Sequence, residues 1–294
     1  MTDNHTECNW RSLLFVPTLA DKFLAKAATR GADAIILDLE DSIAPAQKSL
    51  ARDALPGAVR QLSVDGLDLC VRINRPVEMA IADIGFAVCA DVAALMLPKI
   101  MGPEHVCLLA EVVAERELAL ALQPGHTKFI ALVETADALP NLPAIAKAHP
   151  RMIGLGIGNE DLATELQVVP DEDGLYPFAM QAVAAARAAG ISPFGMLGPF
   201  ANFSDLLAYR TGLQRSRRLG FSSTACIHPA QVAIINEEYG VSPEQLDYAE
   251  RLVAAFDSAL EQGLGAVAFD GTMVDLPVAQ RARKLIEGAS LHSG

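Results

Sequence analysis

A single rhythm, repeated eight times, limits what this chain can fold into. Each repeat is a short run rich in β-branched residues or leucine, followed by an alanine-rich stretch with helical periodicity. Because the runs are apolar nearly throughout, we expect strands that are buried on both faces, as parallel strands under a layer of helices are. The runs cover residues 13–17, 34–40, 69–74, 94–98, 129–134, 152–157, 193–197 and 225–229.

Eight such units predict a (β/α)8 TIM barrel of about 250 residues. An open doubly wound sheet is the alternative, and the periodicity alone does not exclude it. The chain has 294 residues, of which 51% are hydrophobic, so it has room for a barrel and an appendage. We place a barrel with its metal site at residues 1–236 and a C-terminal extension at residues 237–294.

The extension is predicted to be a helix, a hairpin and a second helix. Ser242 and Gln245 form a capping-box pattern at the start of a helix over residues 242–262. Asp270 and Gly271 predict a tight turn between two short strands, and a last helix covers residues 277–288. Because this segment is too small to fold alone, we expect it to pack on the barrel or on a neighbouring subunit.

Charge and composition argue against several classes of partner. A formal net charge of -13 repels phosphate backbones, and no stripe of lysine and arginine offsets it, so nucleic acid is not an expected partner. The longest uncharged stretch, residues 188–204, is interrupted by glycine and proline, so no membrane segment is expected. The five cysteines are scattered and the first ten residues carry no targeting pattern, which favours a cytoplasmic protein with reduced thiols.

Polar residues stand where the predicted strands end. In a (β/α)8 barrel these carboxyl ends converge on one face, where active sites are built. The active site is therefore expected among these side chains. They are Asp38, Glu40, Asp41, Arg72, Asn74, Lys99, Glu134, Asp161 and His228.

Glu134 and Asp161 are the most informative of these residues, because they follow adjacent strands and could share one hard cation. Mg²⁺ usually binds one or two protein carboxylates and keeps its other positions for water and substrate, here a bidentate oxo or hydroxy acid. The alternative is structural, since each acid could cap the following helix or pair with an arginine. Taken together, the two acids favour a metal site.

Arg72 ends a buried strand, which is an unusual place for a guanidinium unless an anion meets it. It could hold a substrate carboxylate or an enolate oxygen with two hydrogen bonds, or it could pair with Asp38 or Glu40. Cys226 and His228 stand two residues apart and could act as a nucleophile and a base, but no orienting acid lies near them in the sequence.

Eight motifs occur in the order that is found in a known family. They are RSLLFVP, DAIILDLEDS, VRIN, LPK, VET, GNEDLA, GPFANFSD and GFSSTACIHPAQ. With these motifs, the chain resembles the citrate lyase β-subunit-like branch of the HpcH/HpaI aldolase family, related to the malyl-CoA and citramalyl-CoA lyases. The resemblance implies a (β/α)8 barrel and a Mg²⁺-dependent carbon–carbon lyase. Such an enzyme would cleave or form β-hydroxyacyl-CoA esters such as citryl-, malyl- or citramalyl-CoA.

The resemblance also implies roles for single residues. Glu134 and Asp161 would bind the metal, and Arg72 would bind substrate oxygens. Asp275, in the C-terminal hairpin, would reach the neighbouring subunit's site as an acid or base, which implies a homo-oligomer, a trimer or a hexamer. Arg72, Glu134 and Asp275 are thus the expected catalytic residues.

The chain departs from the family pattern where an acyl-CoA should bind. Ser223-Thr224 replaces a glycine-lysine pair, Thr18-Leu19 replaces a glycine-serine pair, and Leu197 replaces an aspartate. A phosphate-binding lysine is therefore missing from its expected place.

Other basic groups remain as candidates for the CoA tail. Arg11 precedes the first predicted strand, and Lys22 and Lys26 follow it. The expected substrate-binding residues are thus Arg72, Glu134, Arg11 and Lys22. Two alternative functions stay open: a Mg²⁺ aldolase that acts on a free oxo or hydroxy acid, and a non-catalytic or carrier-dependent subunit of a lyase complex.

Overall fold

The computed structural model describes residues 9–170, 172–198 and 203–290 of the chain. Its main sheet consists of eight parallel strands in the order β7-β6-β5-β4-β3-β2-β1-β8. The strands are β1 (Ser12–Pro17), β2 (Ala34–Asp38), β3 (Asp68–Arg72), β4 (Ala94–Leu97), β5 (Lys128–Val133), β6 (Met152–Ile157), β7 (Ser192–Pro193) and β8 (Thr224–Cys226).

The sheet closes between its two edge strands, β7 and β8. Phe194 and Ser223, which lie directly beside these strands, form an isolated parallel bridge. The main-chain N–H of Gly195 donates to the carbonyl oxygen of Ser223 at 2.8 Å. The prediction of a (β/α)8 barrel is therefore confirmed. An open doubly wound sheet is excluded, because the strands follow one another in sequence order around the ring without a reversal.

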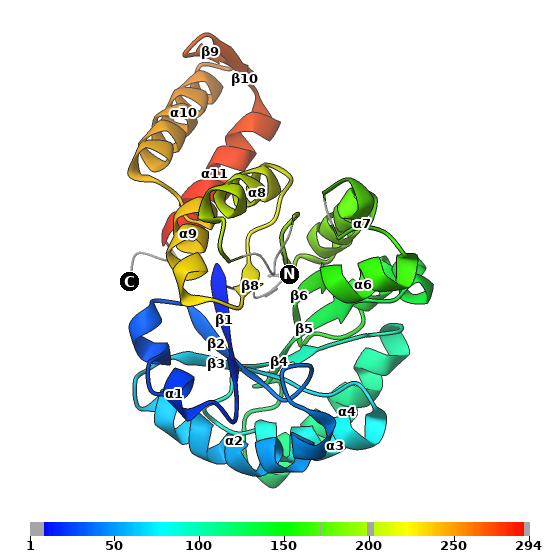
Figure 1. The fold of residues 1–294 in the computed structure, drawn as a ribbon. Helices are drawn as coiled ribbons and strands as arrows, with labels where there is room; N and C mark the ends of the chain where they lie inside the picture. The colour runs from blue at the N-terminus through cyan, green and yellow to red at the C-terminus, as the bar shows by residue number, and fades with distance from the viewer. Residues whose placement is uncertain (1–8, 171, 199–202, 291–294) are drawn as a thin grey trace. The chain divides into compact units, whose positions relative to one another are not determined.

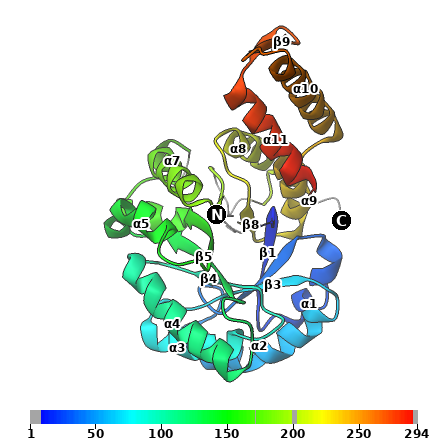
Figure 2. The same cartoon turned by 180° about the vertical axis from the view of Figure 1, so that it is seen from behind.

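Helices cover the outside of the ring of strands (Figures 1 and 2). They follow the strands in turn, as the repeating rhythm of the sequence predicts. They are α1 (Asp21–Leu24), α2 (Lys48–Ser63), α3 (Val77–Ala87), α4 (Pro103–Ala119), α5 (Leu142–Ala146), α6 (Asn159–Leu166), α7 (Glu172–Ala189), α8 (Leu206–Arg218) and α9 (Pro229–Tyr239).

The seventh strand is much shorter than predicted. A strand over residues 193–197 was expected, but β7 ends at Pro193. Two glycines explain the difference, because Gly195 has φ 127° and Gly198 has φ 101°, outside the range of a strand. The chain therefore leaves the sheet just after Phe194.

The strands are buried on both faces, as their continuous apolar runs predict. Every residue of β2, for example, is buried. One set of side chains fills the inside of the barrel, and the other set faces the helices. The inner set comprises Leu13, Ala34, Ile36, Cys70, Ala94, Met96, Ile130, Leu132, Ile153, Phe194 and Ala225, with Trp10 and Phe15 packed against it.

Residues Glu237–Gly294 form a second compact unit, separate from the unit Met1–Asn236. Helix α10 (Pro243–Glu261) begins with the capping box of Ser242 and Gln245. Strands β9 (Val267–Phe269) and β10 (Thr272–Val274) pair antiparallel, and helix α11 (Leu276–Ser290) follows. Asp270 and Gly271 have φ of 44° and 76°, as a tight hairpin turn requires.

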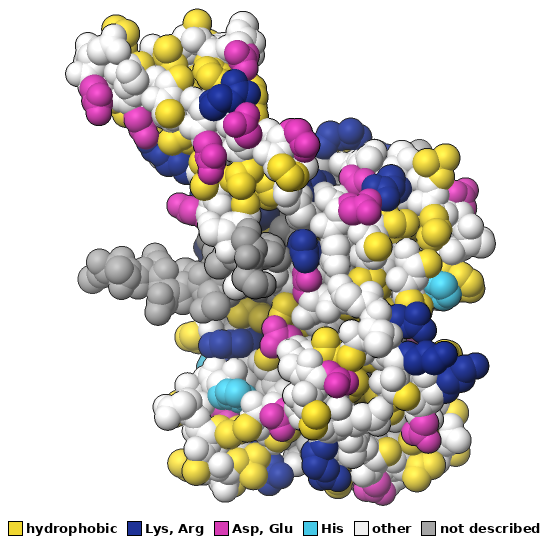
Figure 3. All heavy atoms as spheres, turned by 90° about the vertical axis from the view of Figure 1, so that its left-hand side faces the viewer, with side chains coloured by type: hydrophobic (Ala, Val, Ile, Leu, Met, Phe, Trp, Pro, Cys, Tyr) yellow, Lys and Arg dark blue, Asp and Glu magenta, His cyan; other side chains and the backbone are white. Residues whose placement is uncertain are grey.

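Charged side chains and helix hydropathy describe the surface of the molecule. Lysine and arginine side chains lie among acidic ones on the face that Figure 3 shows, and several of them lie next to one another at its right-hand edge. Among the described residues, no helix is long and apolar enough to cross a membrane.

Candidate active site

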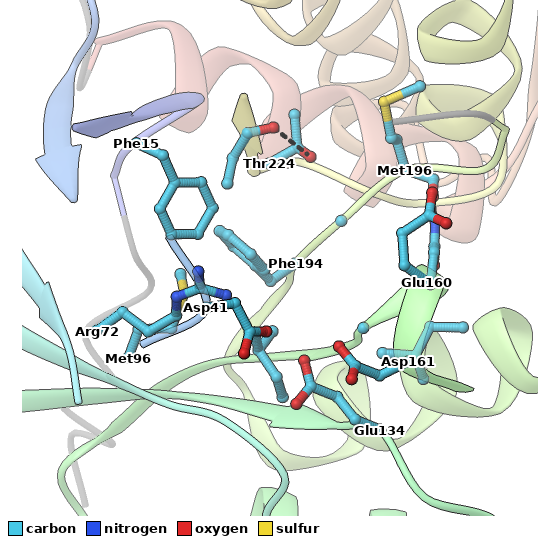
Figure 4. Close-up of a pocket in the computed structure, with 16 residues that line it drawn as sticks. Phe15, Asp41, Arg72, Met96, Glu134, Glu160, Asp161, Phe194, Met196 and Thr224 are labelled. Atoms are coloured by element: carbon cyan, nitrogen blue, oxygen red, sulfur yellow. Dashed lines mark hydrogen bonds between the residues drawn. The ribbon is translucent and has the colours of Figure 1, made fainter. Parts of the chain in front are cut away.

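The carboxyl ends of the strands open into a cavity of about 200 Å³. Glu134 and Asp161 line it with their carboxylates pointing toward one another, and Arg72 approaches from another strand (Figure 4). The structure thus places the three residues that the sequence analysis expected at the metal and substrate in one cavity. This arrangement follows from the barrel, in which the ends of β3, β5 and β6 meet on one face.

Glu134 follows β5 and is only 4% exposed. Its Oε2 accepts a hydrogen bond of 2.8 Å from the main-chain N–H of Lys99. Burial, together with the nearby charges of Glu40 and Asp161, raises the pKa of Glu134 to about 8. A cation bound beside this carboxylate would favour its ionised form.

Gly158 makes room for the Glu134 carboxylate. A Cβ atom at position 158 would lie 2.1 Å from Oε1 of Glu134 and 2.6 Å from its carboxyl carbon. Because such contacts are forbidden, only glycine lets Glu134 take this position. Gly158 also precedes helix α6, which carries Asp161.

Asp161 lies in the first turn of helix α6, and its side chain is 43% exposed. It is therefore the accessible member of the two acids, whereas Glu134 is the buried one. The described residues contain no group of three or more histidine, cysteine or acidic side chains arranged around one ion position. Two carboxylates with water and substrate are, however, the usual set for Mg²⁺, so the oxygen donors present fit that ion.

Arg72 has structural partners as well as a place in the cavity. Its Nε and Nη2 donate to the two oxygens of Asp38 at 2.7 and 2.8 Å, and its Nη1 lies 3.0 Å from Oε2 of Glu40. Its guanidinium stacks on the ring of Phe15, 4.6 Å from the centroid. The two hydrogen bonds use two of its five N–H groups, and with the Glu40 ion pair they fix the plane of the guanidinium beside the cavity.

Lys99 connects the acidic groups of the site. Its φ of 50° is in the left-handed region, which is unusual for lysine. Its Nζ lies 2.7 Å from Glu40, 3.5 Å from Asp41 and 3.5 Å from Asp161. Lys99 and Asp41 were expected at strand ends without a further role, and Glu40 as an alternative partner of Arg72. The contacts of Lys99 with Glu40, Asp41 and Asp161 join the ends of β4, β2 and β6, and they could not be read from spacing.

The remaining lining of the cavity is largely apolar. Phe15 comes from β1, Met96 from β4, Leu132 from β5 and Phe194 from the end of β7. These side chains also belong to, or pack against, the inner layer of the barrel. The cavity therefore has charged groups at or after the ends of β2, β3, β5 and β6, and apolar side chains from β1, β4, β5 and the end of β7.

Three other predicted site residues lie outside this lining. Arg11 precedes β1, at the amino end of the barrel, where its guanidinium forms two hydrogen bonds with Asp33 at 2.8 and 2.9 Å. Its position does not support a role at the opposite end. Lys22 is exposed on α1, after β1. Asp275 belongs to the second unit, where its Oδ1 accepts a 3.3 Å hydrogen bond from the N–H of Val278 at the start of α11.

Cys226 and His228 do not form a nucleophile and base. Burial raises the pKa of the Cys226 thiol to about 12, so it is not a thiolate at neutral pH. His228 stacks on Phe203 with 4.9 Å between the ring centroids.

A closed (β/α)8 barrel with paired acids and an arginine at the carboxyl ends of its strands has the arrangement of an enzyme active site. The chain belongs to the HpcH/HpaI aldolase/citrate lyase family, whose sequence profile matches residues 11–229, and it is a lyase. It is 30% identical to the citrate lyase subunit beta of Leuconostoc mesenteroides subsp. cremoris, over 95% of this chain and 93% of that one.

Two further comparisons cover nearly the whole chain. It is 32% identical to the (3S)-malyl-CoA thioesterase of Cereibacter sphaeroides (strain ATCC 17029 / ATH 2.4.9), over 92% of this chain and 91% of that one. Its fold matches the crystal structure of CitE from Mycobacterium tuberculosis in complex with magnesium, acetoacetate and coenzyme A. The TM-score is 0.74 at 30% identity, with 95% of this chain and 97% of that chain covered.

Proposed function

We propose that this protein is a Mg²⁺-dependent carbon–carbon lyase that cleaves or forms a β-hydroxyacyl thioester of the citryl, malyl or citramalyl type. The observation that carries the proposal is the meeting of Glu134, Asp161 and Arg72 in one cavity. The magnesium, oxo acid and coenzyme A bound by the structural relative support it.

Glu134 and Asp161 would hold the metal. The buried Glu134 lies near other acids, so a divalent cation would relieve the repulsion that raises its pKa. When bound, Mg²⁺ would act as a Lewis acid that polarises the substrate oxygen destined to become the carbonyl of the oxo acid. Substrate carboxylate and hydroxyl oxygens suit the positions that two protein carboxylates leave open.

Arg72 would stabilise negative charge on the acyl fragment after the carbon–carbon bond breaks. Asp38 and Glu40 hold the guanidinium in place, so it needs no rearrangement when charge develops on the enolate oxygen. The N–H groups not used by these two acids would donate to that oxygen. Charge-assisted hydrogen bonds of this kind are stronger than neutral ones.

Asp275 would transfer the proton to or from the acyl fragment, acting in the site of a neighbouring subunit of a homo-oligomer. It lies between the hairpin and helix α11, and one of its oxygens contacts the N–H of Val278. A positioned acid or base of this kind contributes about 10² to 10⁴ in rate. Lys22 and Lys26 on the first β/α connection would meet the acidic tail of a coenzyme A thioester.

The proposal is tested by supplying Mg²⁺ with acyl-CoA candidates and, separately, with free hydroxy acids. Oxo acid and acyl-CoA should appear together from a thioester substrate. Oxo acid from free hydroxy acids alone would replace the thioester with the free-acid aldolase alternative. Free CoA together with the intact hydroxy acid would instead indicate thioester hydrolysis, the reaction that the name of the Cereibacter relative implies. No turnover and no Mg²⁺ binding would leave a non-catalytic subunit.

A further inference from the structure

Within this proposed function, we infer that the oxo acid handled at the site carries a single carboxylate and a small apolar substituent. A 2-oxo acid with a hydrogen, methyl or ethyl group fits this description. An oxo acid with a second carboxylate does not. The inference rests on the charges and the apolar surface that line the cavity.

The described lining of the cavity is rich in acids and poor in cations. Its acidic side chains are Asp41, Glu134, Glu160 and Asp161, and its one cation is Arg72. The charge of a Mg²⁺ ion bound to two of these acids would be balanced by those acids and by the first substrate carboxylate. A second substrate carboxylate would then face the other acids without a cation of its own.

The two cations nearest to the metal position already have carboxylate partners. Arg72 holds Asp38 through two hydrogen bonds and also contacts Glu40. Lys99 has Glu40 at 2.7 Å and lies within 3.5 Å of Asp161. Arg72 keeps only the N–H groups that Asp38 and Glu40 leave, and the proposed function uses these for the acyl fragment. Lys99 would have to leave Glu40 or Asp161 to pair with a second substrate carboxylate.

The side of the cavity that faces the acids offers apolar contact. The rings of Phe15 and Phe194 lie there, across from Glu134 and Asp161 (Figure 4). Met96 and Leu132 add apolar surface from the inner layer of the barrel. A methyl or ethyl group would bury apolar surface against these side chains. A carboxylate there would lose its hydration and, within the described lining, would meet only the Thr224 hydroxyl, which already donates to the carbonyl oxygen of Ala225 at 3.3 Å.

The test compares two acids of equal chain length, 2-oxobutanoate and freshly prepared oxaloacetate, in which a carboxylate takes the place of the terminal methyl. Binding to the full-length protein is measured by calorimetry with saturating Mg²⁺ and again without metal. We expect 2-oxobutanoate to bind more tightly than oxaloacetate by about tenfold or more. This order is the reverse of the one expected from Mg²⁺ alone, which binds a dicarboxylate more strongly than a monocarboxylate. Discrimination below about tenfold, or the reverse order, would overturn the inference. Failure of both acids to bind in a Mg²⁺-dependent way would instead overturn the proposed function, and the inference with it.

A pair of variants checks that the lining is the cause. Phe194→Lys places a cation on the apolar side and should bring the affinity for oxaloacetate up to, or above, that for 2-oxobutanoate. Phe194→Met, similar in size but uncharged, should keep the wild-type order. If a folded Phe194→Lys protein, judged by its thermal transition, discriminated as the wild type does, the assignment of specificity to this surface would be wrong. If it does not fold, the comparison of the two acids on the wild type still decides.

Discussion

The main-chain N–H of Lys99 donates a 2.8 Å hydrogen bond to Oε2 of Glu134, from a backbone with φ of 50°. One residue thus orients the buried acid with its backbone and contacts Asp161 with its ammonium group. Lys99 and a metal ion on Glu134 and Asp161 would be neighbouring positive charges. Removal of the ammonium group should therefore affect metal binding.

We expect Lys99→Met to bind Mg²⁺ more tightly than the wild type by about 1 kcal/mol, because one repulsive positive charge is lost. The metal-free variant should melt at a lower temperature, because Glu40 loses its partner at 2.7 Å. Calorimetry with Mg²⁺ and a thermal scan measure the two effects. Lys99→Arg keeps the charge and is the matched control. Weaker Mg²⁺ binding by a folded Lys99→Met protein would contradict this account of the site.

Glu134→Ala and Glu134→Gln should lose Mg²⁺ affinity by at least about tenfold while keeping the fold. The glutamine variant should also be at least as stable as the wild type without metal, because a pKa of about 8 keeps the metal-free Glu134 mostly protonated at neutral pH and an amide replaces a carboxyl that is already mostly neutral. Titration with Mg²⁺ and circular dichroism check both points. Unchanged metal affinity in either variant would overturn the assignment of Glu134 as a ligand.

Arg72→Lys should lower kcat/KM by about 10² to 10³, although the charge is kept. An ammonium group cannot hold both oxygens of Asp38 and also reach Glu40 and the substrate. Mg²⁺ affinity should change little, which distinguishes this variant from those at Glu134. Activity near that of the wild type would show that Arg72 only pairs with its acidic neighbours.

Asp275→Asn should lower activity by about 10² or more with substrate and metal binding retained. If Asp275 acts in a neighbouring subunit, mixing this inactive variant with Glu134→Ala should restore part of the activity in mixed oligomers. The activity of the mixture after subunit exchange is the measurement. Absence of restored activity, with mixed oligomers demonstrated, would count against action across subunits.

The salt bridge between Glu117 and Arg151 should dominate acid stability at the other end of the barrel. Both side chains are nearly fully buried and form two hydrogen bonds of 2.6 Å. Burial raises the pKa of Glu117, but the bonds from Arg151 and from the N–H groups of Thr127 and Gly125 outweigh it and hold that pKa at about 2. The contribution to stability is therefore complete above the ordinary value of 4.5 and is lost as the pH falls toward 2.

Glu117→Gln should cost about 3 to 5 kcal/mol at pH 7, because Arg151 would stay buried without its counter-charge. Urea unfolding of both proteins at several pH values measures this cost. The difference between them should shrink as the pH falls from 5 toward 3. A difference that does not depend on pH would mean that packing, and not charge, is responsible.

Most of the barrel is predictable because its strands are buried on both faces and so form continuous apolar runs. Residues 193–197 are the exception, because the strand predicted there ends at Pro193. Gly195 and Gly198 adopt positive φ where the chain turns away from the sheet, and the composition of the segment does not reveal the position of that turn. Glu134, Asp161 and Arg72 are predictable as candidates because the fold brings strand ends together. Asp161 lies in the first turn of helix α6 and not on β6 itself, so it is more exposed than Glu134. It still lines the same cavity as Glu134.

The partnerships inside the site are less predictable. The sequence left two roles open for Arg72, substrate binding and pairing with an acidic neighbour. In the structure Arg72 pairs with Asp38 and Glu40 and also lines the cavity. The network around Lys99 joins separate strands, so only the folded arrangement reveals it. Arg11 did carry a signal in the sequence: it precedes its strand, as Asp33 precedes the next one, so both lie at the end away from the cavity.

The bridge between Phe194 and Ser223 has a consequence for local opening of the barrel. Strand β7 has two residues, whereas β5 and β6 have six each, so few hydrogen bonds hold the ring together at this point. Amide hydrogens near β7 and β8 should exchange with solvent faster than those of the central strands. Phe194 also lines the cavity, so a ligand that packs against its side chain would slow this exchange. By the same linkage, that ligand would bind less tightly to a protein molecule whose barrel had opened between β7 and β8.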